Sequence, residues 1–169
     1  MSNKIELSLE DGMRIAHRFL DTIRDPSFCD PVIAGSIRRL RPVVHDIDLV
    51  FKRGECQSPL FLRRRLEHKT GISLQLLRWG EKLAAIIYCG VPIDLYFSTP
   101  ETFNTLLLIR TGSKENNIRL CSIAKARGWK LHASGDGLFN ERGERIAGDS
   151  ERSIYDALGV PWQEPWERG

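Results

Sequence analysis

Apolar side chains recur along this chain with two periods, and the periods predict where its helices and strands lie. After Ser8, apolar residues return every three or four positions as far as Ile23, which predicts an amphipathic helix begun by a capping box of Ser8 and Asp11. Short apolar runs bounded by glycine and proline are typical of strands. Further helices are expected over residues 59–68, 99–108, 114–127 and 150–158, and strands over residues 31–34, 45–51, 72–77, 83–88, 91–97, 129–132, 138–140 and 145–147.

The order of these elements changes near residue 99, and the change predicts two parts. Residues 1–98 are expected to form an α/β sheet that carries several acidic side chains. Residues 99–169 are expected to form a small lobe of helices and a β-hairpin with glycine-rich turns. A chain of 169 residues is long enough for one domain, or for one domain with a small appendage.

The composition is that of an ordinary globular protein and excludes little. Hydrophobic residues make up 41% and charged residues 28% of the chain, and the net charge of +3 permits a polyanionic partner without demanding one. No apolar run approaches ~18 residues and the N-terminus lacks an apolar stretch, so we expect no membrane span and no signal peptide. The four cysteines lack metal-site spacing and are expected to be buried thiols of a reducing compartment, in the cytoplasm, a nucleoid or a virus: Cys29, Cys56, Cys89 and Cys121.

The strand expected at residues 45–51 carries two acids on an otherwise apolar segment. Because side chains alternate between the faces of a strand, Asp46 and Asp48 would share one face, with Ile47, Leu49 and Phe51 on the other. Neighbouring carboxylates repel each other, and a cation that prefers oxygen ligands, Mg²⁺ or Mn²⁺, relieves that repulsion. A third acid, Asp94, would join them if its own strand, residues 91–97, is a neighbour.

A candidate phosphate site precedes these acids. Gly35 and Ser36 are expected to form a turn with free backbone N–H groups, and Arg38 and Arg39 follow it. Metal carboxylates beside a phosphate site indicate phosphoryl or nucleotidyl transfer. Each feature alone has a simpler explanation: a surface Asp-x-Asp, an ordinary turn, a solvated arginine face, or an ion pair of Asp94 with an arginine. The combination favours a two-metal site.

These residues resemble a known family. Gly35-Ser36 followed by Asp46-Ile47-Asp48 resembles the signature of the nucleotidyltransferase superfamily built on the palm of DNA polymerase beta. The arginines after Ser36 extend the resemblance to the family X DNA polymerases, and so do three later segments: Thr111–Asn117, Gly137–Phe139 and Ser150–Trp162. The resemblance covers residues from about 7 to 168.

The resemblance implies an α+β fold: a nucleotidyltransferase (DNA polymerase beta-like) palm with a mixed sheet and flanking helices in residues 1–98, and a C-terminal thumb, the nucleotide-selection lobe, in residues 99–169. It implies a monomeric, DNA-directed DNA polymerase that uses two Mg²⁺ or Mn²⁺ ions. The enzyme would add deoxynucleoside monophosphates from an incoming dNTP to the primer 3′-hydroxyl of primer-template or gapped DNA, as in short-gap filling during repair.

The resemblance also implies residue roles. Asp46 and Asp48 would bind both ions, and Asp94 would bind the ion at the primer hydroxyl. The residues implied at the triphosphate are Gly35, Ser36, Arg39 and His45. Those implied at the sugar and base are Ile109, Arg110, Thr111, Gly112, Ser113 and Asn117. Those implied at DNA are Lys114, Arg119, Lys125 and Arg127.

Several positions depart from the family pattern. The family's lyase domain and helix-hairpin-helix module are missing from this sequence, so we expect no lyase activity and weak, salt-sensitive DNA binding. Ile109 and Arg110 replace an aromatic pair that crowds the sugar, so we expect ribonucleotides to be incorporated. His45 replaces a small residue, and it would either face the triphosphate or pack on a neighbouring strand. Cys121 stands where an arginine often contacts the template.

The sequence leaves open the role of a basic segment and the acceptor of the reaction. The arginines at positions 63–65 would form a solvated helix face or contact the DNA backbone. The chain could transfer nucleotides to RNA, a small molecule or a protein in place of DNA, or add them without a template. A third possibility is a degenerate DNA-binding remnant, which the presence of all three aspartates argues against.

Overall fold

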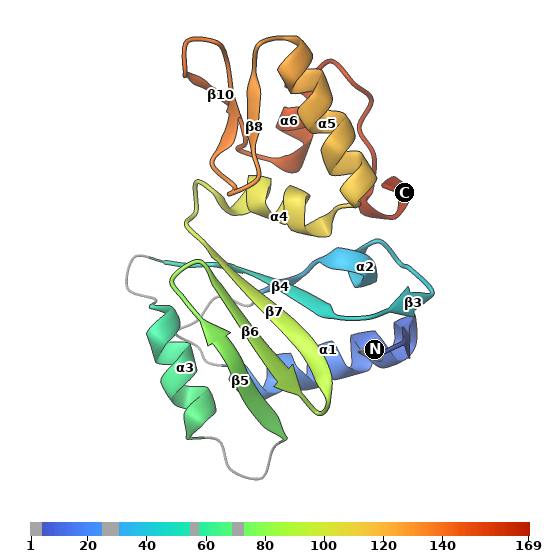
Figure 1. Cartoon of the computed structure of the whole chain (residues 1–169), viewed down its shortest axis with the longest axis vertical. Coiled ribbons are helices and arrows are strands. Elements are labelled where there is room, and N and C mark those ends of the chain that lie inside the picture. Colours follow the sequence, from blue (N-terminus) through green and yellow to red (C-terminus); the bar gives the residue numbers. More distant parts are fainter. Residues whose placement is uncertain (1–4, 25–30, 55–57, 69–72) are drawn as a thin grey trace.

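The first lobe is a mixed sheet with two helices on one face (Figure 1). The computed structural model describes residues 5–24, 31–54, 58–68 and 73–169. The five strands lie in the order β2-β4-β7-β6-β5; β4 and β7 are parallel and the other neighbours antiparallel. The strands are β2 (Val32–Ile33), β4 (Ile47–Lys52), β5 (Leu74–Trp79), β6 (Leu83–Tyr88) and β7 (Val91–Ser98). The helices are α1 (Leu9–Ile23) and α3 (Pro59–Glu67), and a two-stranded ladder joins β1 (Leu7–Ser8) to β3 (Val43–Val44).

The capping box at the start of α1 is confirmed in its main contact. The backbone N–H of Asp11 donates to Ser8 Oγ at 3.0 Å, which satisfies one of the N–H groups left unpaired at a helix start. Ala16 and Phe19 then lie on the buried stripe of this helix, against the sheet.

Alternation along β4 places its apolar and acidic side chains on opposite faces of the sheet. Ile47 and Leu49 are fully buried against α1 and α3, and Asp48 lies on the other face. Val50, on the acidic side, is nevertheless buried as well. It belongs to a small cluster that closes the far end of this face under the helix α4 (Phe103–Thr111): Ala34, Val50, Tyr96, Leu106 and Leu107. The face therefore stays open only where the acids lie.

The second lobe has its own core. A three-stranded antiparallel sheet packs with α5 (Lys114–Ala126) and α6 (Glu151–Ala157) around buried residues that include Leu120, Leu138 and Tyr155. The strands are β8 (Lys130–His132), β9 (Gly137–Phe139) and β10 (Arg145–Ala147), and a short 3₁₀ helix, Pro165–Glu167, follows α6. Helix α4 lies between this lobe and the first sheet (Figure 1).

An ion-pair network joins the two lobes. Arg38, at the end of the short helix α2 (Gly35–Arg38), donates to Glu151 Oε1 at 2.6 Å and to Thr111 Oγ1 at 2.7 Å. The second carboxylate oxygen of Glu151 accepts from Arg168 at 2.7 Å, and the Arg168 side chain is fully buried. Glu151 is thus the one anion shared by two arginines in this network.

Four expectations from the sequence need correction. Gly35 and Ser36 do not form an isolated turn, because they open α2. The strand expected from residue 45 begins at Ile47, so Asp46 lies just before it. The helix expected from residue 99 begins at Phe103, because the Thr102 hydroxyl accepts the N–H of Thr99 and closes a turn first. Cys89 is exposed rather than buried, whereas Cys29 and Cys56 lie outside the described residues.

The remaining expected elements are present with ends shifted by a few residues, and the start of the strand expected at 72–77 lies outside the described residues. Among the helices that the structure describes, none has the length and apolar character needed to span a bilayer.

Because Glu151 bonds both Arg38 and Arg168, we expect its removal to lower the stability of the fold. Glu151→Ala leaves Arg168 buried without its carboxylate partner, and breaking a buried pair in this way costs about 3 kcal/mol or more of unfolding free energy. The control is Asp149→Ala, which breaks an ion pair with Arg145 whose acid is 87% exposed and should cost less than about 1 kcal/mol. Urea unfolding of both variants measures the difference, and equal small losses would contradict the prediction.

Candidate active site

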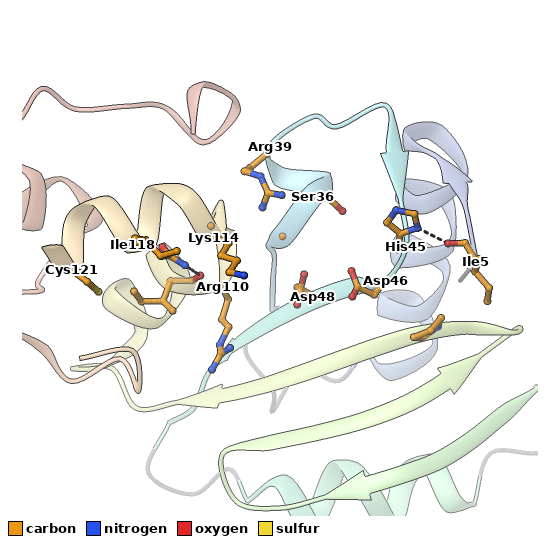
Figure 2. Close-up of a pocket in the computed structure, with 15 residues that line it drawn as sticks. Ile5, Ser36, Arg39, His45, Asp46, Asp48, Arg110, Lys114, Ile118 and Cys121 are labelled. Atoms are coloured by element: carbon orange, nitrogen blue, oxygen red, sulfur yellow. Dashed lines mark hydrogen bonds between the residues drawn. The ribbon is translucent and has the colours of Figure 1, made fainter. Parts of the chain in front are cut away.

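A cavity of about 800 Å³ lies between the two lobes (Figure 2). Its first wall comes from α2 and the start of β4, and its second from the end of α4 and the start of α5. Ten of the residues implied at the ions, the triphosphate, the sugar or the base line it: Gly35, Ser36, Arg39, His45, Asp46, Asp48, Ile109, Arg110, Gly112 and Asn117. One implied DNA contact, Lys114, lines it too.

The three aspartates lie on the same side of the sheet. Asp46 and Asp48 both line the cavity and lie next to each other below Ser36 (Figure 2). Asp94 is the register partner of Asp48 on the parallel neighbour β7. Asp94 itself is not part of the cavity lining.

Burial and repulsion from neighbouring acids make two of these carboxylates, those of Asp48 and Asp94, hard to ionise. Burial raises the pKa of Asp48 to about 7, and the charges of Asp46 and Asp94 contribute to the rise. The pKa of Asp94 is also raised, first by burial, while a hydrogen bond from Tyr96 opposes the rise. The three groups therefore interact electrostatically as a set.

The donor set fits a divalent cation in its chemistry. All three groups are oxygen ligands of the kind that Mg²⁺ and Mn²⁺ take, and a cation would remove the repulsion that raises the pKa of Asp48. Within the described ranges, no three His, Cys, Asp or Glu side chains are already gathered closely enough to count as a metal cluster. Asp46, Asp48 and Asp94 would therefore hold a cation only after their carboxylates draw together.

Gly35 lets the backbone approach the acids. A Cβ at this position would lie 1.9 Å from Asp48 Oδ2, and the residue has φ +58°, so only glycine fits without strain. The next residue, Ser36, has a buried hydroxyl oxygen without a hydrogen-bond partner in the described part of the chain. A buried unpaired hydroxyl is costly, so this atom is suited to a ligand that can bond with it.

Two basic side chains of the first lobe, Arg39 and His45, also line the cavity. Arg39 donates through Nη1 to the backbone carbonyl of Thr111, and burial lowers its pKa from the ordinary value, with Arg41 adding to the effect. His45 donates through Nδ1 to the carbonyl of Ile5 at 2.8 Å, so its ring is fixed from the side away from the acids (Figure 2).

The second lobe brings some implied residues to the cavity and uses others in its own packing. The Asn117 side chain donates to the carbonyl of Ile109 at 2.8 Å and keeps a buried Oδ1 without a partner among the described residues. Thr111 is fully buried and accepts from Arg38, and the Ser113 hydroxyl accepts the N–H of Asn116 at the start of α5. Neither of these two side chains lines the cavity.

Three implied DNA contacts also lie away from the cavity. Arg127 donates to the carbonyls of Ala157 and Leu158 at the end of α6, which caps that helix. Arg119 donates to Asn116 and Gln163. Lys125 lies in the last turn of α5.

Sequence reasoning missed other parts of the site. The cavity also contacts Ile5, Pro92 and Ile118, which no motif marked. Arg38 was expected at the phosphate, yet it holds Thr111 and Glu151. Tyr96, whose hydroxyl donates to Asp94 Oδ2 at 3.2 Å, could have been suspected only from its place two residues after an acid on the same strand.

The chain is similar to known DNA polymerases in sequence and in fold. Residues 106–169 match the family model described as DNA polymerase beta thumb. The chain is 32% identical over 130 residues to the DNA polymerase/3′-5′ exonuclease PolX of Bacillus subtilis (strain 168), an alignment that covers 76% of this chain and 22% of that protein. The chain thus spans about a fifth of the length of this relative.

Solved structures share the whole fold. The Leishmania infantum polymerase beta in a ternary P/T complex matches with a TM-score of 0.80 at 18% identity, over 98% of this chain and 77% of that one. The ternary gap complex of the same polymerase matches with a TM-score of 0.81 at 18% identity, over 97% and 71% of the two chains.

The fold is therefore the α+β nucleotidyltransferase fold of polymerase beta, with a mixed sheet and a small C-terminal lobe. The thumb match and the similarity to PolX both relate the chain to the family X DNA polymerases. We call the two lobes palm and thumb from here on. The thumb model begins inside α4, and the boundary expected at residues 98 and 99 stays a prediction.

The raised pKa of Asp48 predicts how stability depends on pH. Between its ordinary value of 3.8 and about 7, the folded protein binds more protons than the unfolded chain, so the stability of the metal-free protein falls as pH rises. Asp48→Asn removes this dependence. From about pH 5 to about pH 8, the free energy of unfolding of the wild type should fall relative to this variant by on the order of 3 kcal/mol.

Urea unfolding in EDTA at several pH values measures this difference. Asp149→Asn, which changes an acid that is 87% exposed, is the control and should follow the wild-type profile. Parallel profiles of the wild type and Asp48→Asn would show that Asp48 has an ordinary pKa.

Proposed function

We propose that this chain is the palm and thumb of a template-directed DNA polymerase that adds deoxynucleoside monophosphates to a primer 3′-hydroxyl. The observation that carries the proposal is the meeting of two acids, Asp46 and Asp48, with Ser36 and Arg39 in one cavity between the lobes. Such a cavity offers a place for cations and a triphosphate together. The similarity to PolX and to the polymerase beta fold supports DNA as the acceptor.

The palm acids would hold two divalent cations, Mg²⁺ or Mn²⁺. When bound, such ions activate the attacking hydroxyl and stabilise the charge of the departing pyrophosphate. Asp46 and Asp48 would serve both ions, and Asp94, from the neighbouring strand, would serve the one at the primer end.

Other residues of the cavity would hold the triphosphate. The unpaired Ser36 hydroxyl is free to donate to a phosphate oxygen, and the Gly35 backbone lies against Asp48, which brings phosphate and carboxylates close together. The guanidinium of Arg39 would offset negative charge on the phosphates. His45 lines the same wall. Because its Nδ1–H already bonds the Ile5 carbonyl, Nε2 can donate to a phosphate oxygen only when the ring carries both protons.

The thumb would position the base and the DNA. Asn117 lines the cavity, and its unpaired Oδ1 can accept a hydrogen bond from a base or from a bridging water. Lys114, exposed at the start of α5 and at the cavity edge, would contact the DNA backbone, and such contacts weaken as salt rises.

Short-gap filling is the setting that we propose for this activity. The polymerase beta of Leishmania infantum, whose fold this chain shares, has been solved as a ternary gap complex. Transfer to RNA, a protein or a small molecule is the rival, and the match of residues 106–169 to a polymerase thumb argues against it.

The central test is extension of a primer across a single-nucleotide gap with Mg²⁺, using each of the four template bases in turn. Addition should follow the template base. Asp94→Asn should lower the rate by about 10³-fold or more, because a ligand of the primer-side ion is lost, while DNA binding stays within about twofold.

The matched control is Asp149→Asn, an exposed acid far along the chain, which should retain the wild-type rate. Tailing that ignores the template, or full activity of Asp94→Asn, would refute the proposed reaction or the proposed third ligand, respectively.

The wall of the cavity predicts weak discrimination against ribonucleotides. None of the described residues that line it is Phe, Tyr or Trp, and Ile109 and Arg110 occupy the positions expected at the sugar. The preference for a deoxynucleotide over the ribonucleotide, measured as kcat/KM, should stay below about 100-fold, because no bulky ring meets the 2′-hydroxyl.

Ile109→Tyr should increase the preference for the deoxynucleotide by placing a ring at this wall. Steady-state kinetics with paired deoxy and ribo substrates measure both proteins. A wild-type preference above about 10³-fold would contradict the prediction.

A further inference from the structure

A chain of two contacts joins a thumb arginine to a palm carboxylate through a tyrosine ring. Arg110, in the last turn of α4, lies over the ring of Tyr96 with its Cζ atom 4.3 Å from the ring centroid. The hydroxyl of the same tyrosine donates to Asp94 Oδ2 at 3.2 Å. Three side chains from two lobes are therefore connected in series.

Tyr96 is held in a single place by its surroundings. Its side chain is 7% exposed and belongs to the cluster of Ala34, Val50, Leu106 and Leu107 that seals the sheet under α4. The neutral phenol of Tyr96 carries one O–H, and the structure directs it at Asp94 Oδ2. Its donor can bond only one oxygen of Asp94 at a time, which leaves Oδ1 for another ligand.

Arg110 can hold this ring in place without forming an ion pair with one of the acids. In the part of the chain that the structure describes, it makes no ion pair within 4.0 Å with an acid, and its buried Nε has no hydrogen-bond partner. A planar guanidinium stacks on an aromatic face in a way that an ammonium does not reproduce. The stack therefore ties the ring orientation to the position of α4.

From this geometry we infer that Tyr96 is a positioning residue for Asp94 and that Arg110 clamps Tyr96 from the thumb. The pair aims one oxygen of Asp94 at the primer-side cation when α4 is seated on the palm. The inference rests on the proposed polymerase function for its kinetic consequences, and on the hydrogen bond and the stack alone for its effect on metal binding.

The test uses two conservative variants and one matched control. Tyr96→Phe removes the hydroxyl and keeps the ring, and Arg110→Lys keeps the charge and removes the planar stack. The control is Lys52→Met, which removes the other cation–π contact between the palm and α4, that of Lys52 with Phe103 at 5.8 Å, without touching the acids.

Two readouts separate positioning from general stability. Mn²⁺ titration followed by water-proton relaxation should show about tenfold weaker binding in Tyr96→Phe and in Arg110→Lys, as for other groups that orient a metal ligand, and no change in Lys52→Met. In gap filling, kcat should fall about tenfold with KM for the nucleotide within about twofold, and the double variant should be no slower than either single one, because both act through one hydroxyl.

Wild-type Mn²⁺ affinity in Tyr96→Phe would overturn the inference, as would equal losses in Lys52→Met or losses that multiply in the double variant. Failure of the wild-type protein to extend any primer would instead refute the proposed function. The Mn²⁺ titration would then decide this inference by itself.

Discussion

The parallel pairing of β4 with β7 is the constraint on which the rest of the site depends. This register sets Asp48 beside Asp94, two acids that are far apart in the sequence, on the face of the sheet opposite the main core. Burial and repulsion then raise the pKa of Asp48 to about 7. A pair of ionised carboxylates in such a place destabilises the metal-free fold, and protonation or an external cation relieves the repulsion.

The two lobes are joined by groups that also border the cavity. Arg38 is the last residue of α2 and Arg39 follows it directly. Both contact Thr111, the last residue of α4, Arg38 through the hydroxyl and Arg39 through the backbone carbonyl. Arg38 continues to Glu151 and so to the buried Arg168. Any movement of the thumb therefore changes the surroundings of α2, where the triphosphate is proposed to bind, because this helix carries Ser36 and Arg38 and is followed directly by Arg39.

Local features of this protein could be predicted from its sequence, and contacts between distant segments could not. Some features follow from rules that involve only nearby residues. These are the Ser8 cap, the alternation of faces along β4, and the position of Asp94 on the face of β7 opposite Ile93 and Leu95. The start of α4 was missed because a hydrogen bond inside the Thr99–Thr102 turn competes with helix initiation. The Arg38–Glu151 contact joins positions 113 residues apart, and only the packing of both lobes fixes it.

The stacking of Arg110 on Tyr96 explains how its guanidinium can lie near the acids without occupying their carboxylate oxygens. Its charge opposes the rise in the pKa of both Asp48 and Asp94, so the metal-free site is partly compensated. A direct ion pair would compensate it further, but a divalent cation would then have to displace a charge-assisted hydrogen bond. Stacking on Tyr96 keeps the guanidinium close through a weaker contact that leaves the carboxylate oxygens available. The site thus keeps part of its repulsion, and that residual repulsion would favour the proposed binding of a divalent cation.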